Sequence, residues 1–236
     1  MAQPKYRRVL LKLSGEALAA GSDSILNFEF VEKVSKVIHQ CVNAGVEVAV
    51  IVGAGNIWRG RQGGKMDRTR ADSMGMLATV INSIALQDAF IAEGMEAVVM
   101  TAVPMKAFAD PFTARDAVSA LKAGKVVIFG AGLGAPYFST DTAAAVRAAE
   151  IGADCILMAK NIDAIYSDDP KINPKAVRYT DLTYRRILDE GLRALDLSAA
   201  IFCMDNNLRG YAFGLSDPEN IYRVIMGEAV GTEIHN

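Results

Sequence analysis

The chain has 236 residues and a mass of 25.3 kDa, so we expect a single α/β domain spanning residues 1–236. Hydrophobic residues make up 51% and charged residues 22%, which excludes intrinsic disorder. The net charge of −2 argues against a broad electrostatic contact with nucleic acid, and we expect no such partner. We also expect no membrane association, because the uncharged run 126–140 is too short and too rich in glycine to span a bilayer.

Cysteine and histidine usage limits the possible chemistry. Cys41, Cys155 and Cys203 are odd in number, far apart and set in apolar stretches. This spacing excludes a disulfide scaffold or zinc ribbon and predicts reduced core thiols in a cytoplasmic protein. The two histidines, His39 and His235, are isolated, which argues against a His-centred triad or metal site. We expect no direct metal ligand in the protein.

In chain order, short apolar runs alternate with segments of helical periodicity. The runs predict strands over residues 9–13, 46–52, 98–103, 126–129 and 155–158. The periodic segments predict helices over residues 30–42, 74–85, 114–123 and 140–151, which end near Gly45, Gly94, Gly124 and Gly152. Residues 162–178 are mostly polar and contain prolines, which predicts a hairpin or an excursion of the chain.

A repeated strand–helix order predicts the fold class, an α/β three-layer αβα sandwich around a largely parallel sheet. In such sheets, ligands bind at the edge formed by the carboxyl ends of the strands. Four loops are expected there: Ser14–Gly15, Gly53–Gly60, Gly130–Ser139 and the segment from Lys160 onward. Glycine-rich loops after strands favour phosphate binding, because several backbone N–H groups can converge on an anion.

Two familiar phosphate motifs do not fit. A Walker A loop needs Ser or Thr after Gly-Lys, but Gly64-Lys65 and Gly124-Lys125 are followed by other residues. The run 130–135 matches GxGxxA of a dinucleotide-binding fold, but Pro136 follows at once. The acidic residue expected at the end of the next strand is also missing, since Asp154 opens that strand instead.

Four local groups remain, and each has a structural alternative. Lys12 lies at the end of the first strand before a Ser-Gly turn, although it could be a surface lysine. Arg59 follows the glycine loop 53–56, which could be a simple tight turn. Asp72 lies at the predicted start of a long helix and could merely interact with its dipole. Asp141 follows Ser139 and Thr140, which could be a helix cap. Because all four groups are expected at one edge of the sheet, they favour a site in which two phosphorylated ligands bind next to each other.

These segments resemble the amino acid kinase family and, within it, the bacterial-type UMP kinases, over essentially the whole chain. Segments 12–18 (KLSGEAL) and 53–60 (GAGNIWRG) resemble the family's two glycine motifs. Segments 66–68, 72–79 and 134–141 resemble the nucleoside monophosphate site of UMP kinases, and 158–170 resembles the ATP-side segment. The resemblance implies an amino acid kinase-like fold with a phosphate-acceptor half over roughly 1–150 and an ATP-side half over roughly 151–236.

The resemblance also implies transfer of the ATP γ-phosphoryl group to UMP, giving UDP and ADP in pyrimidine nucleotide biosynthesis. The implied catalytic residues are Lys12, Arg59 and Asp141, with Asp141 orienting Lys12 or the metal shell. The implied UMP-binding residues are Ala54, Asp72, Leu133, Gly134, Ala135, Pro136, Tyr137, Phe138, Ser139 and Thr140. The implied ATP-binding residues are Lys12, Leu13, Ser14, Gly15, Gly55, Arg59, Asn161, Tyr166 and Asp169. Mg²⁺ bound with ATP, UTP as an inhibitor and a homohexamer are implied as well.

The implied chemistry needs no acid–base pair, because a monophosphate oxygen is already an anion at neutral pH. Two alternatives stay open: another enzyme of this fold that phosphorylates a carboxylate or small phosphate, and a non-catalytic nucleotide sensor. Retention of Lys12, Arg59 and Asp141 argues against the sensor. The sequence departs from the family where Ala54 and Ala164 replace usual glycines. It departs again at 23–27, where Asp23 and Ile25 replace glycines associated with a GTP response.

Overall fold

The computed structural model describes residues 3–59, 64–192 and 194–236. Within them, nine strands form one sheet in the order β4-β3-β5-β2-β1-β6-β10-β11-β9. Every neighbouring pair in this sheet is parallel except β10 and β11. The strands are β1 (Arg8–Leu13), β2 (Glu47–Val52), β3 (Ala97–Thr101), β4 (Asp110–Pro111), β5 (Val126–Gly130), β6 (Cys155–Lys160), β9 (Asp181–Thr183), β10 (Gly210–Gly214) and β11 (Thr232–His235).

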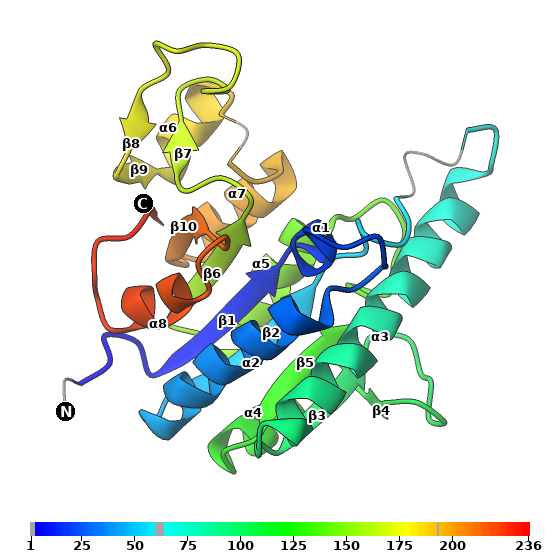
Figure 1. Ribbon diagram of the computed structural model, residues 1–236. Coiled ribbons are helices and arrows are strands. Elements are labelled where there is room, and N and C mark those ends of the chain that lie inside the picture. Colours follow the sequence, from blue (N-terminus) through cyan, green and yellow to red (C-terminus); the bar gives the residue numbers. More distant parts are fainter. Residues whose placement is uncertain (1–2, 60–63, 193) are drawn as a thin grey trace.

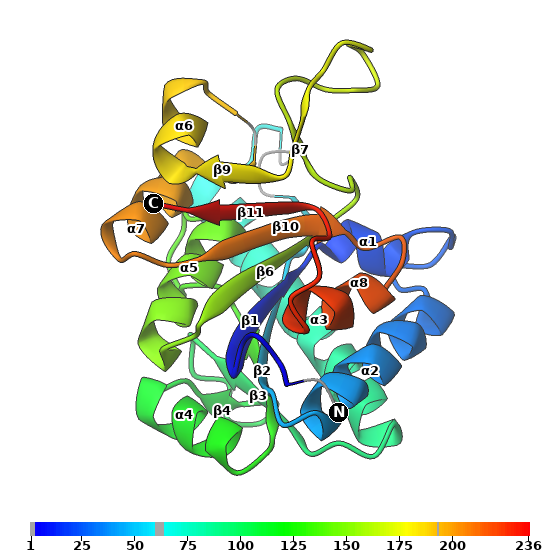
Figure 2. The ribbon, with the colours of Figure 1, turned by 90° about the vertical axis from the view of Figure 1, so that its left-hand side faces the viewer.

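Helices cover both faces of this sheet, as Figure 2 shows most clearly. On one face lie α1 (Gly15–Ala19), α2 (Phe28–Asn43), α3 (Arg68–Ala92) and α8 (Glu219–Ile225). On the other lie α4 (Ala114–Lys122), α5 (Thr140–Ile151), α6 (Tyr184–Asp189) and α7 (Leu197–Asp205). Alternation along β1 explains the two cores, because Val9 and Leu11 face the first layer and Leu10 the second. The predicted three-layer α/β sandwich is therefore confirmed.

The central elements match the sequence predictions closely. Helix α5 covers the predicted residues 140–151 and ends at Gly152, whose φ of 63° is the left-handed conformation typical of a glycine after a helix. The three cysteines are buried and free, as predicted. The predicted excursion over 162–178 contains an antiparallel pair, β7 (Ile165–Tyr166) and β8 (Arg178–Tyr179), which stands above the main sheet (Figure 1).

One helix boundary was predicted wrongly. Helix α3 begins at Arg68, six residues before the predicted start, and the Asp67 side chain caps it by accepting from the Arg70 N–H. Asp72 therefore lies in the second turn, so its interpretation as a partner of the helix N-terminus is incorrect. The error arose because the first turn is polar and shows no apolar periodicity until Met74.

Helix α3 presents apolar side chains to both sides. Its inner face packs on β2, β3 and β5, while its outer face exposes a stripe that we call the α3 stripe. The stripe consists of Met74, Leu77, Ile81, Ile84 and Ile91, which are between 39% and 55% exposed. By length and composition alone, α3 could cross a membrane. In the most apolar stretch of the helix, 39% of the residues are buried in the fold, and the α3 stripe supplies exposed apolar side chains.

Candidate active site

A cavity of about 550 Å³ opens at the carboxyl edge of the central strands, where the sequence predicted the ligand site. Its size is typical of small-molecule sites. The loops after β1, β2 and β5 line it together with the first turns of α3 and α5. The lining residues are Lys12, Ser14, Gly15, Gly53, Ala54, Gly55, Trp58, Arg59, Arg68, Asp72, Gly75, Met76, Thr79, Gly132, Leu133, Ala135, Tyr137, Phe138, Ser139, Thr140 and Asp141.

An ion pair between Lys12 and Asp141 lies in the cavity wall. The Lys12 Nζ is 2.9 Å from Asp141 Oδ1, and the two side chains are 15% and 20% exposed. Lys12 reaches this point from the carboxyl end of β1, and Asp141 from the first turn of α5. The fold thus brings two predicted catalytic residues into contact, and the Lys12 ammonium faces the space where an anion would bind.

Lys160, which the sequence analysis did not assign to the site, lies near this pair. It ends β6, and its Nζ donates to the Ala194 carbonyl oxygen. Burial raises the pKa of Asp141, but the ammonium groups of Lys12 and Lys160 outweigh it and the net pKa is lowered. Burial lowers the pKa of Lys160, and the Asp141 carboxylate offsets part of that effect. The sequence could have indicated Lys160 as a site residue, because this lysine lies at the carboxyl end of a buried strand, as Lys12 does.

The two glycine loops approach each other at backbone distance. A Cβ atom on Gly15 would lie 2.5 Å from the Gly53 carbonyl oxygen and 2.9 Å from the Gly55 nitrogen. No side chain fits there, so glycine is required at position 15. The amide N–H groups of Ser14, Gly15, Ala54 and Gly55 make no hydrogen bond to another described residue. These four donors are therefore available to an anion in the cavity.

Arg59 reaches the cavity from the loop after β2 and forms an ion pair with Glu16 of α1. Arg59 is about half exposed, so its guanidinium can exchange this partner for a phosphate. Glu16 is a second residue that the sequence analysis left without a role. The predicted loop also included Gly60, which lies outside the described residues.

Asp72 anchors the loop that follows β5. Its carboxylate accepts from the Arg68 Nε at 2.8 Å and from the Tyr137 N–H at 2.8 Å. Thr79, two turns further along α3, accepts from the Ala131 N–H at 2.9 Å. Four residues of the loop have positive φ: Ala131, Gly132, Gly134 and Tyr137, at 62°, 56°, 74° and 72°. Contacts from α3 thus hold this loop in a conformation that side chains rarely adopt.

The start of α5 is held by two kinds of contact. Ser139 caps the helix by accepting from the N–H groups of Asp141 and Thr142, so the cap alternative is correct for Ser139. Asp196, which caps α7, accepts hydrogen bonds from the hydroxyl groups of Ser139 and Thr142. This contact between helices leaves the Asp141 carboxylate directed at Lys12.

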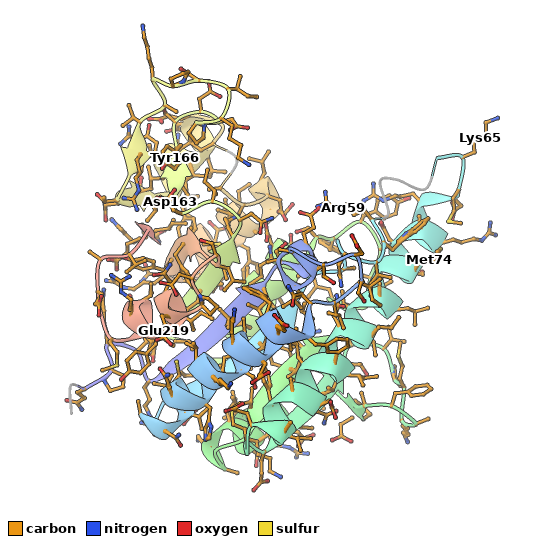
Figure 3. The ribbon with its side chains drawn as sticks, viewed as in Figure 1. Arg59, Lys65, Met74, Asp163, Tyr166 and Glu219 are labelled. Carbon is orange, nitrogen blue, oxygen red and sulfur yellow. The ribbon has the colours of Figure 1, made fainter. Side chains whose placement is uncertain are left out.

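Some predicted site residues lie elsewhere. Leu13 is fully buried in β1, and neither Gly134 nor Pro136 belongs to the cavity wall. The predicted ATP residues Asn161, Tyr166 and Asp169 lie after β6, in or beside the excursion, and do not line the cavity. Figure 3 shows Tyr166 well separated from Arg59. The Tyr166 hydroxyl donates to Asp163 at 2.9 Å, and Asp163 also pairs with Arg178 at 2.9 Å.

The described residues contain no cluster of three His, Cys, Asp or Glu side chains that could bind a metal ion. The charge around the cavity is supplied instead by Lys12, Arg59, Arg68 and the carboxylates of Asp72 and Asp141. Cationic groups and a set of unpaired amides can neutralise phosphates, and a carboxylate can bind hydroxyl groups. The arrangement suits a phosphorylated ligand with a polar sugar.

Comparisons with known proteins agree with this geometry. A sequence model of the amino acid kinase family matches residues 7–213. The structure is similar to that of UMP kinase from Bacillus anthracis, with 37% identity, a TM-score of 0.94 and coverage of 98% of this chain and 96% of that one. It is also similar to UMP kinase from Ureaplasma parvum, with 34% identity, a TM-score of 0.92 and coverage of 98% and 100%. Uridylate kinase from Archaeoglobus fulgidus follows at 28% identity, a TM-score of 0.74 and coverage of 96% and 99%. The chain therefore belongs to the amino acid kinase family.

Proposed function

We propose that this chain is a UMP kinase, which transfers the γ-phosphoryl group of ATP to UMP and gives UDP and ADP for pyrimidine nucleotide biosynthesis. The observation that carries the proposal is one cavity that holds Lys12, Arg59, both glycine loops and Asp72. The similarity to UMP kinases over nearly the full length of each chain supports it. Fold alone would not, because one fold hosts many reactions.

In the proposed reaction, an oxygen of the UMP phosphate forms a bond to the γ-phosphorus of ATP. The bond from that phosphorus to the bridging oxygen breaks, and ADP leaves with the electron pair. The attacking oxygen is already anionic, so the protein needs to fix the line of attack and neutralise charge. In this proposal Lys12 and the amides of Ser14 and Gly15 would hold the transferring oxygens, and Arg59 and Gly55 would contact the phosphates between the two nucleotides; that all of them line one cavity supports these roles.

The substrate assignments distinguish the cavity from the excursion after β6. Asp72 would accept from the ribose hydroxyls of UMP, Ala54 would contact its phosphate, and the loop 133–140 would surround uracil and ribose. Asn161, Tyr166 and Asp169 would contact ATP. Mg²⁺ would enter with the ATP phosphates and add positive charge to them. Asp141, which pairs with Lys12, would orient that lysine or the metal shell.

A coupled ADP-release assay tests the proposal with UMP, CMP, dTMP, aspartate and acetylglutamate as acceptors. We expect strong preference for UMP, because a site that pairs with the uracil N3–H and carbonyls leaves groups unpaired when cytosine enters. Equal kcat/KM for UMP and CMP would contradict the role of the loop 133–140. Turnover of a carboxylate would favour the other enzymes of the family, and nucleotide binding without turnover would favour the sensor.

We also propose that residues 1–236 form one domain that assembles into a homohexamer. The nine-stranded sheet runs through both halves of the chain, which supports a single domain. The α3 stripe supports self-association, because its spacing of three and four residues is that of a helix–helix seam and its apolar side chains are exposed. Light scattering of the wild type and of Leu77→Glu, which places a charge in the stripe, tests the assembly. A hexamer that survives the substitution would place the interface elsewhere.

Two further expectations complete the proposal. UTP would inhibit by occupying the UMP site, so its inhibition constant should rise with the UMP KM when that site is altered. The cytoplasm is the proposed location, supported by three buried cysteines that are all unpaired in the structure. Competition kinetics with UTP and cell fractionation test these points separately.

A further inference from the structure

The side-chain amides of Asn56 and Asn82 face each other where the second glycine loop packs against α3. Asn56 belongs to that loop, and Asn82 projects from α3 and is fully buried. The Asn82 Nδ2 donates to Asn56 Oδ1 at 2.8 Å, and the Asn56 Nδ2 donates to Asn82 Oδ1 at 2.9 Å. We call this reciprocal arrangement the amide pair. Neither residue has a role in the proposed phosphoryl transfer.

The remaining hydrogens of the amide pair bind backbone carbonyls of two different segments. Asn82 donates to the Gly53 oxygen at 2.8 Å, and Asn56 donates to the Ile25 oxygen at 2.6 Å. Each NH₂ group has two hydrogens, so all four donors of the pair are used. A buried polar network that is fully satisfied is rigid, because any displacement leaves a buried group without its partner.

The amide pair controls the direction of the loop amides. A trans peptide is planar, so its C=O and N–H point in opposite directions. Fixing the Gly53 carbonyl toward α3 therefore turns the Ala54 N–H away from α3, and Ala54 and Gly55 line the cavity. The pair also touches the first glycine loop, since a Cβ on Gly15 would lie 2.5 Å from Asn56 Oδ1. Asn82 thus holds the second glycine loop, and Asn56, which pairs with it, adjoins the first.

We infer that Asn56 and Asn82 are positioning residues for phosphoryl transfer, which set the register of the two glycine loops without contact to either nucleotide. This inference rests on the proposed function. A loop error of about 1 Å in a phosphoryl-transfer site is enough to cost about 100-fold in rate.

The sharpest test is Asn82→Asp, which keeps the shape of the side chain. A carboxylate oxygen would then face two acceptors, the Gly53 carbonyl and Asn56 Oδ1, in place of the donor. We expect kcat/KM for UMP to fall about 10- to 100-fold. Burial raises the pKa of the introduced carboxyl group, and its protonated form can donate again. The loss relative to wild type should therefore shrink as the pH is lowered from about 8 to about 6.

Ser35→Ala is the matched control. Ser35 is also fully buried, and its Oγ donates to the Ala89 carbonyl oxygen of α3 at 3.0 Å, at a point that does not line the cavity. We expect a lower Tm and kcat/KM within about twofold of wild type, because one hydrogen bond of about 1 kcal/mol is lost away from the site. If this control reduces kcat/KM as much as Asn82→Asp does, general destabilisation explains the effect and the inference is wrong.

Asn56→Ser serves if Asn82→Asp does not fold, because Asn56 is only partly buried and its replacement is smaller. Hydrogen exchange of the peptide that contains Gly53 to Arg59 gives a readout that is independent of activity. We expect faster exchange there in the Asn56 and Asn82 variants and no change in the Ser35 variant. Unchanged exchange together with unchanged kcat/KM overturns the inference. Absence of UMP turnover by the wild type would overturn the proposed function, while the exchange data would still test the loop positioning.

Discussion

The cavity between the glycine loops is held by buried contacts. The excursion after β6 is anchored at its base by a buried hydrogen bond from the Ile165 N–H to Thr232 Oγ1, but its outer part is held by exposed contacts. On the cavity side, Asn82 and Thr79 bind loop backbone groups from inside the fold. On the excursion, Asp163 pairs with Arg178 and Tyr166 at the surface. Surface ion pairs contribute about 0–1 kcal/mol, while removing one partner of a buried hydrogen bond costs about 1–3 kcal/mol.

This difference indicates that the cavity and the excursion, which we propose to bind the two nucleotides, are preorganised to different degrees. At the cavity, buried contacts fix the loops, and the amides of the glycine loops make no hydrogen bond to another described residue. Asn161, Tyr166 and Asp169, which we propose to contact ATP, lie in or beside the excursion, whose outer contacts are individually weak, so this segment can adjust when ATP binds.

Lys12→Ala should lower kcat about 10²- to 10³-fold, because it removes a preorganised cation from the transferring phosphoryl group. UMP affinity should change little, since the donor acts mainly in the transition state. Single-turnover kinetics and UMP titration measure the two quantities. Lys36→Ala, in an exposed ion pair with Glu32, is the control and should leave both unchanged. A Lys12 variant that keeps more than about a third of kcat would remove Lys12 from the proposed mechanism.

Asp141→Asn should destabilise the protein by about 2–4 kcal/mol at neutral pH, because two partly buried ammonium groups lose their carboxylate. The pKa of Asp141 is lowered in the fold, so its contribution is present above its ordinary pKa of about 4 and is lost as the pH falls through the lowered value. Without Asp141, the pKa of Lys160 should fall further, so the deficit should also shrink at alkaline pH.

Urea unfolding of wild type and Asp141→Asn at acidic, neutral and alkaline pH measures that deficit. A deficit that stays constant over the whole range would show that the carboxylate and the two lysines are not coupled. The ion pair between Lys12 and Asp141 would then stabilise the cavity wall less than its geometry indicates.

Asp72→Asn should raise the KM for UMP, with a loss of about 1.5–3 kcal/mol, because a carboxylate makes strong hydrogen bonds to ribose hydroxyls. The same change weakens the contacts with Arg68 and the Tyr137 N–H, so the loop 133–140 should also loosen. Thr113→Ala is the control, since Thr113 caps α4 outside the cavity wall and its loss should lower the Tm with an unchanged KM. An Asp72 variant with an unchanged KM would assign this residue a purely structural role.

Tyr166→Phe should change the KM for ATP only a few-fold, because it removes one exposed hydrogen bond worth about 0.2–1 kcal/mol. The KM for UMP should stay constant, since Tyr166 does not line the cavity. Initial-rate kinetics with each nucleotide varied in turn measure both. An effect on ATP of more than about 30-fold would mean that the excursion is as firmly prepared as the cavity.

GTP should stimulate the enzyme weakly or not at all. Asp23 and Ile25 stand where the family usually has glycines, so the backbone loses access to positive φ and gains a negative charge near a triphosphate. The Ile25 carbonyl is also engaged by Asn56. Initial rates at sub-saturating UMP with and without GTP test this, and stimulation of several-fold would show that those glycines are not required.

Local sequence patterns determined much of the central fold. Apolar runs and helical periods defined β1, β2 and α5, and Gly152 marked the end of α5, because these signals lie within one element. The same order of elements predicted that Lys12 and the glycine loops would share one edge of the sheet. The C-terminal elements α6 to α8 and β9 to β11 were not predicted, since their runs are short and β11 pairs antiparallel to β10.

Only the tertiary structure decided which side chains meet. Lys12 and Asp141, Arg59 and Glu16, and Asn56 and Asn82 come from different elements, and no spacing in the chain relates them. It also placed three of the predicted ATP residues, Asn161, Tyr166 and Asp169, in or beside the excursion, whereas the predicted ATP residues of the glycine loops line the cavity. Periodicity reports which face of an element is buried, but contacts between elements depend on sheet order, register and loop direction, which packing of the whole chain fixes.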